Sequence, residues 1–134
     1  MNKLRNLIVA SIFVSCGAYA ATGTQRFESF EVHRHDGVGP SFNYSSAAAT
    51  SSDPVVITVV GRTMTSKDRQ FRTDLQRNWL STEVPKVFVF VGRDQVECAL
   101  VRTHEWPLCD RYSYVDPGTH VRHDYYFYLG NWPD

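Results

Sequence analysis

The stretch "VVITVVGRTMTSKDRQFRTDLQRNWLS", residues 55–81, decides the predicted fold. It opens with Val55–Val60, six residues that are apolar without alternation. A run that short and that uniformly apolar predicts a strand buried on both faces, as in a parallel sheet. Gly61-Arg62 ends the run. We therefore place the first core strand here and read the rest of the fold outward from it.

A helix is predicted directly after this strand. Thr65 is followed three residues later by Asp68, which is close to the capping box that marks a helix N-terminus. Phe71, Leu75 and Trp79 recur every fourth residue and predict one buried face.

The next strand is predicted at Lys86–Val91, after Pro85 and before Gly92-Arg93. Strand, helix and strand in this order predict a right-handed βαβ unit. "RYSYVDPG" (111–118) and the alternating "HVRHDYYFYLG" (120–130) predict further strands. The predicted fold class is α/β, a small three-layer domain built on the βαβ unit with additional C-terminal strands.

The N-terminus is typical of an exported protein. Residues 1–20 combine a basic start, an apolar run and an Ala-Tyr-Ala ending, which predicts a signal peptide, with a short type II membrane anchor as the alternative. Residues 21–52 end in "SSAAATSS" and predict a flexible stalk. Residues 53–134 are then the domain. We expect a secreted or lumenal protein with no membrane span beyond the N-terminal segment.

Charge argues against nucleic acid as a partner. The 134 residues hold 14 basic and 14 acidic residues. Removal of residues 1–20 takes Lys3 and Arg5, so that about two net negative charges remain. Of the cysteines, Cys98 and Cys109 would remain, and we expect them to form a disulfide, with two buried thiols as the alternative. Asn43 begins an Asn-Tyr-Ser sequon, which predicts glycosylation in a eukaryote.

Both Gly-Arg strand ends are candidate ligand contacts. Ligands of open α/β sheets bind beyond the carboxyl ends of parallel strands. Arg62 and Arg93 would lie at that edge and could hold a diphosphate, or they could serve only solubility. The chain has no phosphate-binding Gly-rich loop.

Residues 54–94 resemble the start of the catalytic domain of β-1,3-galactosyltransferase-like glycosyltransferases. The resemblance rests on an apolar strand, an Arg-rich helix ending at Trp79, and a strand ending "FVG". It implies a nucleotide-sugar-binding domain, with Arg72 at a family arginine position beside the candidates Arg62 and Arg93. It also implies Mn²⁺ or Mg²⁺ as cofactor.

The chain departs from that family at its metal site, because no Asp-x-Asp occurs in the sequence. Without this motif nothing neutralises the leaving diphosphate. The resemblance therefore implies a truncated or degenerate hexosyltransferase-like domain, whose activity as an enzyme stays open.

Two further candidate sites are indicated by short motifs. "HEWPL" and "PGTHVRHD" faintly resemble secreted guanyl-specific ribonucleases, with Glu105 as general base, Arg122 on the phosphate and His120 as acid. "HRHD" (33–36) and "HVRHD" (120–124) could together bind a metal, or each could be solvated; we assign no metal ligand.

A non-enzymatic alternative is a small secreted binding or effector protein with one disulfide. Its aromatic C-terminal strand, "YYFYLGNWPD" (125–134), would contact a protein partner, since Tyr and Trp dominate interface energetics. Half of these side chains would equally well fill the core.

Overall fold

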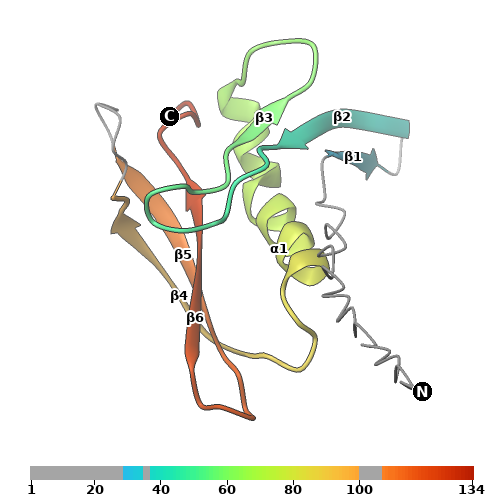
Figure 1. Ribbon diagram of the computed structural model, residues 1–134. Helices are drawn as coiled ribbons and strands as arrows, with labels where there is room; N and C mark the ends of the chain where they lie inside the picture. Colours follow the sequence, from blue (N-terminus) through green and yellow to red (C-terminus); the bar gives the residue numbers. More distant parts are fainter. Residues whose placement is uncertain (1–28, 35–36, 100–106) are drawn as a thin grey trace, which may run out of the picture.

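The computed structural model describes residues 29–34, 37–99 and 107–134 (Figure 1). Over these residues it has two three-stranded antiparallel sheets, in the orders β1-β2-β3 and β4-β5-β6, together with one α-helix. The elements follow the chain as β1 (Ser29–Arg34), β2 (Gly37–Tyr44), β3 (Ile57–Val59), the 3₁₀ helix η1 (Ser66–Phe71), α1 (Arg72–Glu83), β4 (Val89–Glu97), β5 (Leu108–Val115) and β6 (Arg122–Tyr128). The domain thus mixes sheet and helix, as predicted.

The βαβ unit itself does not form, because the strands before and after the helix belong to different sheets. β3 pairs antiparallel with β2, whereas β4 pairs antiparallel with β5. The apolar run is also not buried on both faces, since Ile57 and Val59 are buried while Thr58 and Val60 are exposed. That alternation is typical of an antiparallel strand with one face on the core and the other exposed to solvent.

The stalk predicted over residues 21–52 is also wrong for the described part of that segment, which contains β1 and β2. Phe42 and Tyr44 alternate along β2 and are buried, and the Tyr44 hydroxyl donates to the Leu75 carbonyl at 2.8 Å. The Ser/Ala-rich run after β2 is folded too, with Ala47 and Ala49 buried. Small side chains let this loop pack closely, where a linker would be solvated.

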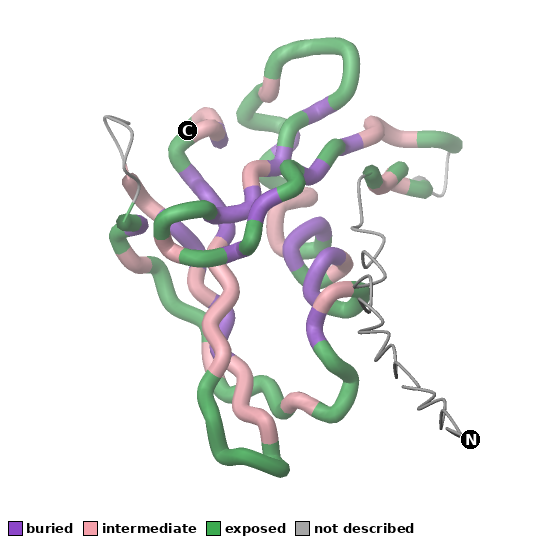
Figure 2. Tube along the Cα trace, in the orientation of Figure 1, coloured by how far each residue is buried: buried purple, intermediate pink, exposed green. Residues whose placement is uncertain are grey.

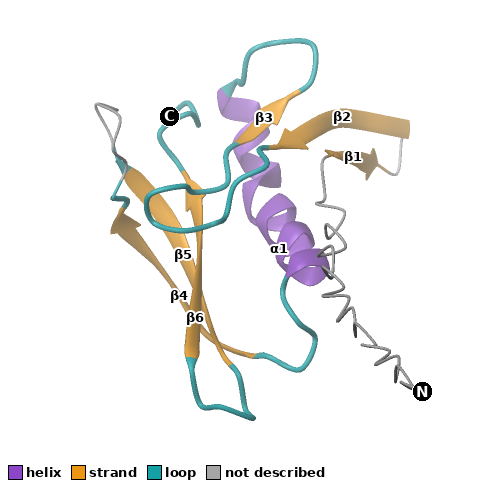
Figure 3. Ribbon diagram, in the orientation of Figure 1, coloured by secondary structure: helices purple, strands orange, loops and turns teal. Residues whose placement is uncertain are grey.

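This loop joins the two sheets. Figure 3 shows it crossing from β2 to β3, and it runs beside β6 on the way. Tyr126 N–H donates to the Ala49 carbonyl, and Val55 forms a parallel bridge with Phe127. The run that was expected to separate the stalk from the domain instead pairs with the last strand.

The predicted helix is confirmed, with its capping box. The Asp68 carboxylate accepts the Thr65 N–H at 2.8 Å, and the first turns form η1 before α1 begins at Arg72. The predicted buried face is present: Leu75 and Trp79 lie in the core and Phe71 packs against it. Figure 2 shows the buried positions gathered on one side of α1.

The predicted C-terminal strands are confirmed as β5 and β6. One face of β6 carries His123, Tyr125 and Phe127, as the alternation predicts. Trp79 of the helix meets the rings of Tyr125 and Phe127 at centroid distances of 6.2 Å and 5.4 Å. α1 therefore packs on sheet β4-β5-β6 through aromatic contacts and on sheet β1-β2-β3 through Leu75 and Tyr44.

A buried polar network ties α1 to β5. Gln76 and Asp110 have no exposed surface. Gln76 donates through Nε2 to Asp110 Oδ2 at 2.9 Å and accepts from the Tyr112 hydroxyl through Oε1 at 2.8 Å. Such a network fixes the position of the helix on the sheet, because each partner left alone would be a buried, unsatisfied polar group.

The disulfide between Cys98 and Cys109 is confirmed. It joins the residue after β4 to β5, and the two Cα atoms lie 5.5 Å apart. Such a bond fits the oxidising compartment expected of an exported protein. Residues 1–20, where the signal peptide or anchor is expected, lie outside the described residues. No helix in the described part of the chain is both long and apolar enough to cross a membrane.

Candidate functional site

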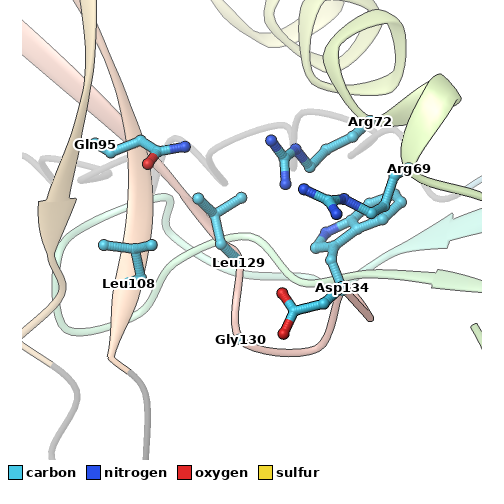
Figure 4. A pocket seen from close by; sticks show the side chains of 8 residues that line it. Arg69, Arg72, Gln95, Leu108, Leu129, Gly130 and Asp134 are labelled. Atoms are coloured by element: carbon cyan, nitrogen blue, oxygen red, sulfur yellow. The ribbon is translucent and has the colours of Figure 1, made fainter. Parts of the chain in front are cut away.

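A polar cavity of about 430 Å³ lies where the start of the helical segment faces β4, β5 and the C-terminal residues (Figure 4). Its size lies within the range of small-molecule sites. Four separate parts of the chain line it: Arg69 and Arg72 of the helical segment; Gln95 of β4; Leu108 of β5; and Leu129, Gly130, Trp132 and Asp134 after β6.

Two arginines form the helical wall of the cavity. Arg69 and Arg72 are three residues apart, so both lie on the same side of the helical segment. Figure 4 shows both guanidinium groups directed into the space in front of Gln95 and Leu129. Within the described residues neither side chain makes an ion pair, so their charge is available to a ligand.

Two buried donors of this cavity are unsatisfied. Arg72 Nε and Trp132 Nε1 are shielded from solvent and have no hydrogen-bond partner among the described residues. Trp132 is only 7% exposed. Buried Trp N–H groups usually find an acceptor, so each exception requires an explanation. Both donors belong to residues that line the cavity, but the donor atoms themselves are closed to solvent, so an acceptor in the cavity reaches them only if these side chains move.

The other residues that line the cavity add an amide, apolar surface and one carboxylate. Gln95 adds an amide from β4, and Leu108 and Leu129 add apolar surface. Asp134 contributes the one carboxylate side chain of the lining. The arrangement suits a small anion whose oxygens meet the guanidinium and amide donors while its body lies against leucine.

Arg62 and Arg93, the other two nucleotide candidates, have partners within the protein. Both nitrogens at the end of Arg62 donate to the Asp68 carboxylate, at 2.8 Å each. This pairing holds the pKa of Asp68 well below its usual range. Arg93 Nη2 donates to Asp110 Oδ2 at 2.7 Å, and its guanidinium lies over the Tyr112 ring. The structure therefore does not bring the three candidate arginines to one sheet edge; only Arg72 lines the cavity.

A second, smaller cavity of about 300 Å³ lies beside Arg62, between η1 and Pro40. Lys67 is its other basic residue. Because Arg62 is already bound to Asp68 in a bidentate ion pair, this cavity offers fewer open donors than the one beside Arg72.

The ribonuclease candidates are partly described. Glu105 lies outside the described residues. His120 is exposed in the turn between β5 and β6, with a left-handed φ of 60°. Arg122 donates to Asp124 Oδ1 at 2.8 Å and to Ser113 Oγ at 2.7 Å. Arg122 therefore already donates to two acceptors on the sheet. The ribonuclease site of Glu105, His120 and Arg122 stays a prediction.

The two histidine motifs fall on different sheets. His33 is in β1 and His123 in β6, while His35 and Asp36 lie outside the described residues. No group of three or more His, Cys, Asp or Glu side chains in the described part of the chain could hold a metal ion. Asn43, the glycosylation candidate, is exposed on β2.

The aromatic tail divides between the core and the cavity. Phe127 and Tyr128 are buried in or beside the sheet, while Trp132 lines the cavity. Sequence reasoning placed Trp132 in a partner-binding tail and did not connect it to Arg72. Arg69 and Arg72 were identifiable as charges off the buried helix stripe. No local signal links them to Gln95 or Trp132, which only the folded chain brings to them.

Comparisons with protein-family models, with curated proteins and with solved structures give no match. The resemblance to β-1,3-galactosyltransferase-like enzymes therefore stays a prediction from residues 54–94. The chemistry of the cavity must carry the functional conclusion.

Proposed function

We propose that this chain is a small exported binding protein whose cavity holds an organic anion with a carboxylate or phosphate group. The observation that carries the proposal is the pair of guanidinium groups, of Arg69 and Arg72, that face the cavity and make no ion pair within the described residues. An oxyanion supplies several acceptor lone pairs, so one group in the cavity can accept from the guanidinium groups of both Arg69 and Arg72. The adjacent leucines favour a ligand with an apolar body over a bare inorganic ion.

The test follows the indole N–H resonance of Trp132 in a ¹H–¹⁵N spectrum, assigned by its disappearance in Trp132→Phe. Inorganic phosphate, phenyl phosphate and benzoate serve as probes. We expect the resonance to shift on titration, with phenyl phosphate or benzoate binding more tightly than inorganic phosphate. No shift with any probe at millimolar concentration contradicts the proposal.

Two arginine variants distinguish binding in the cavity from nonspecific attraction of an anion to the positive charge of the protein. Arg72→Met removes a donor of the cavity, whereas Arg77→Met makes the same change at an exposed position of α1 that does not line it. A charge-assisted hydrogen bond contributes about 1.5–3 kcal/mol, so Arg72→Met should weaken binding about tenfold or more. Equal losses in the two variants would show that the attraction is nonspecific.

A nucleotide-sugar ligand is the second candidate, favoured by one observation: Arg72, the family-position arginine, lines this cavity. UDP with and without Mn²⁺ therefore joins the probes. Binding of UDP that is lost in Arg72→Met supports the glycosyltransferase-like prediction. Binding of phenyl phosphate or benzoate without binding of UDP favours the simple binding protein.

A further inference from the structure

The outer edge of β4 carries unpaired backbone groups. β4 is the edge strand of its sheet, with β5 on one side. Within the described residues no other strand pairs with Val89–Glu97. The opposite edge of the sheet is different, because Ala49 and Val55 bond to β6 at Tyr126 and Tyr128. This sheet therefore has one edge covered by its own chain and one left open.

The open strand also exposes apolar side chains. Val89, Phe90 and Val91 are 54%, 53% and 55% exposed, and Val87 just before the strand is more exposed still. Figure 2 shows this part of the chain largely at the surface. A long unpaired edge strand is a template for pairing with another chain, and these apolar residues lie at the beginning of that edge. Proteins that remain monomeric usually protect such an edge.

The hydrogen-bond pattern tells which backbone groups are free. Cys98 N–H donates to the Pro107 carbonyl, and the same register pairs Val96 with Cys109 and Asp94 with Arg111. Hydrogen-bonded and non-hydrogen-bonded pairs alternate along an antiparallel ladder. The N–H and C=O groups of Arg93, Gln95 and Glu97 therefore point away from β5, into the open edge.

We propose that β4 pairs with β4 of a second copy of this chain, antiparallel about a two-fold axis at Gln95. In this register each Gln95 faces its counterpart, and each Arg93 faces the other copy's Glu97. All three outward-facing residues then exchange backbone hydrogen bonds across the axis. Arg93 keeps its bond to Asp110, and its side chain is still 30% exposed, so that its guanidinium can face Glu97 of the other copy as well. Opposite charges on directly opposed residues stabilise such a pair.

Charge disfavours some of the neighbouring symmetric registers, and the one at Gln95 sets Arg93 opposite Glu97. A two-fold antiparallel pair places one residue opposite itself. An axis at Arg93 or at Asp94 would set like charges directly opposite each other, which is destabilising. Because both copies use the same edge, the contact is isologous and closes as a dimer instead of extending into a fibre.

Sedimentation equilibrium of the purified protein tests the proposal. We expect a reversible monomer–dimer equilibrium. Glu97→Lys replaces both Arg93–Glu97 pairs by like charges and should raise the dimer dissociation constant about tenfold or more. Glu31→Lys, the same change on an exposed residue of β1, is the matched control and should leave the constant unchanged. A protein that is monomeric at every concentration, or equal effects of the two variants, overturns the proposal.

Cysteine cross-linking tests the register itself. Directly opposed residues of a hydrogen-bonded antiparallel pair have Cα atoms about 5.5 Å apart, which suits a disulfide. Gln95→Cys should therefore give a covalent dimer on mild oxidation, while Glu31→Cys should not. Dimerisation without cross-linking at Gln95 would show that the copies meet through another surface, and the proposed pairing would be wrong.

Discussion

Replacing Gln76 by Met should destabilise the fold although the two side chains are similar in size, because Gln76 makes two hydrogen bonds in a buried polar network. The substitution keeps an unbranched side chain of similar length and removes both hydrogen bonds. Asp110 then keeps only Arg93 as a partner, with its Oδ1 already unsatisfied, and the Tyr112 hydroxyl loses its acceptor. Both residues are almost fully buried, so water cannot replace the lost contacts without opening the core.

The magnitude follows from the two bonds. A hydrogen bond to a charged group contributes about 1.5–3 kcal/mol and a neutral one about 0.5–1.5 kcal/mol. We therefore expect Gln76→Met to lower the free energy of unfolding by about 2–4 kcal/mol. In urea, at a slope of about 2 kcal/mol per molar, in the middle of the range for small proteins, this shifts the midpoint by about 1–2 M.

Urea unfolding monitored by tryptophan fluorescence, with the disulfide intact, measures this loss. The matched control is Gln70→Met, because Gln70 is exposed on η1 and bonds only to the Lys67 carbonyl. It should cost less than about 0.5 kcal/mol. A decrease in the free energy of unfolding of less than about 1 kcal/mol for Gln76→Met would show that leaving Asp110 and Tyr112 without this partner costs little, and would refute the reasoning.

A double-mutant cycle sharpens the same test. Asp110→Leu alone leaves the Gln76 amide without an acceptor, whereas Gln76→Met with Asp110→Leu removes both polar partners together. The double variant should therefore be more stable than the sum of the single losses predicts, by about 1 kcal/mol or more. Strict additivity would show that the two residues act independently.

Two further predictions concern Asp68 and the disulfide. The Arg62 guanidinium lowers the pKa of Asp68 in the folded state, so this carboxylate stabilises the fold above the unfolded pKa of about 4 and the contribution is lost as pH falls below it. The stability of Asp68→Asn, measured by urea unfolding at pH 7 and pH 3, should therefore depend less on pH than that of the original chain; an unchanged dependence contradicts the assignment. Replacing Cys98 and Cys109 by Ser should lower the free energy of unfolding by about 2–3 kcal/mol, because the bond closes a short loop in the unfolded chain. Reduction of the original chain should reproduce this loss, and a reduced chain as stable as the oxidised one contradicts it.

Local patterns predicted the local structure well. Thr65 and Asp68 form the predicted cap, and Leu75 and Trp79 form the predicted buried face. Helix caps and amphipathic faces depend on residues within two turns of one another, so the sequence contains the whole interaction. The alternation of β6 and the pairing of Cys98 with Cys109 were readable for the same reason: both are short-range patterns.

The sequence alone therefore determined the helix, its cap, the last strands and the disulfide. It did not determine which strand pairs with which, since Val55–Val60 reads equally well as a parallel core strand or as an antiparallel strand beside β2. Only the tertiary structure decided that Arg93 has a carboxylate partner in Asp110 and that Arg72 and Trp132 line one cavity. Those residues lie far apart in the chain, and their placement depends on how the sheets pack around α1, which no local pattern encodes. The Arg62–Asp68 pair spans only six residues and is a local contact.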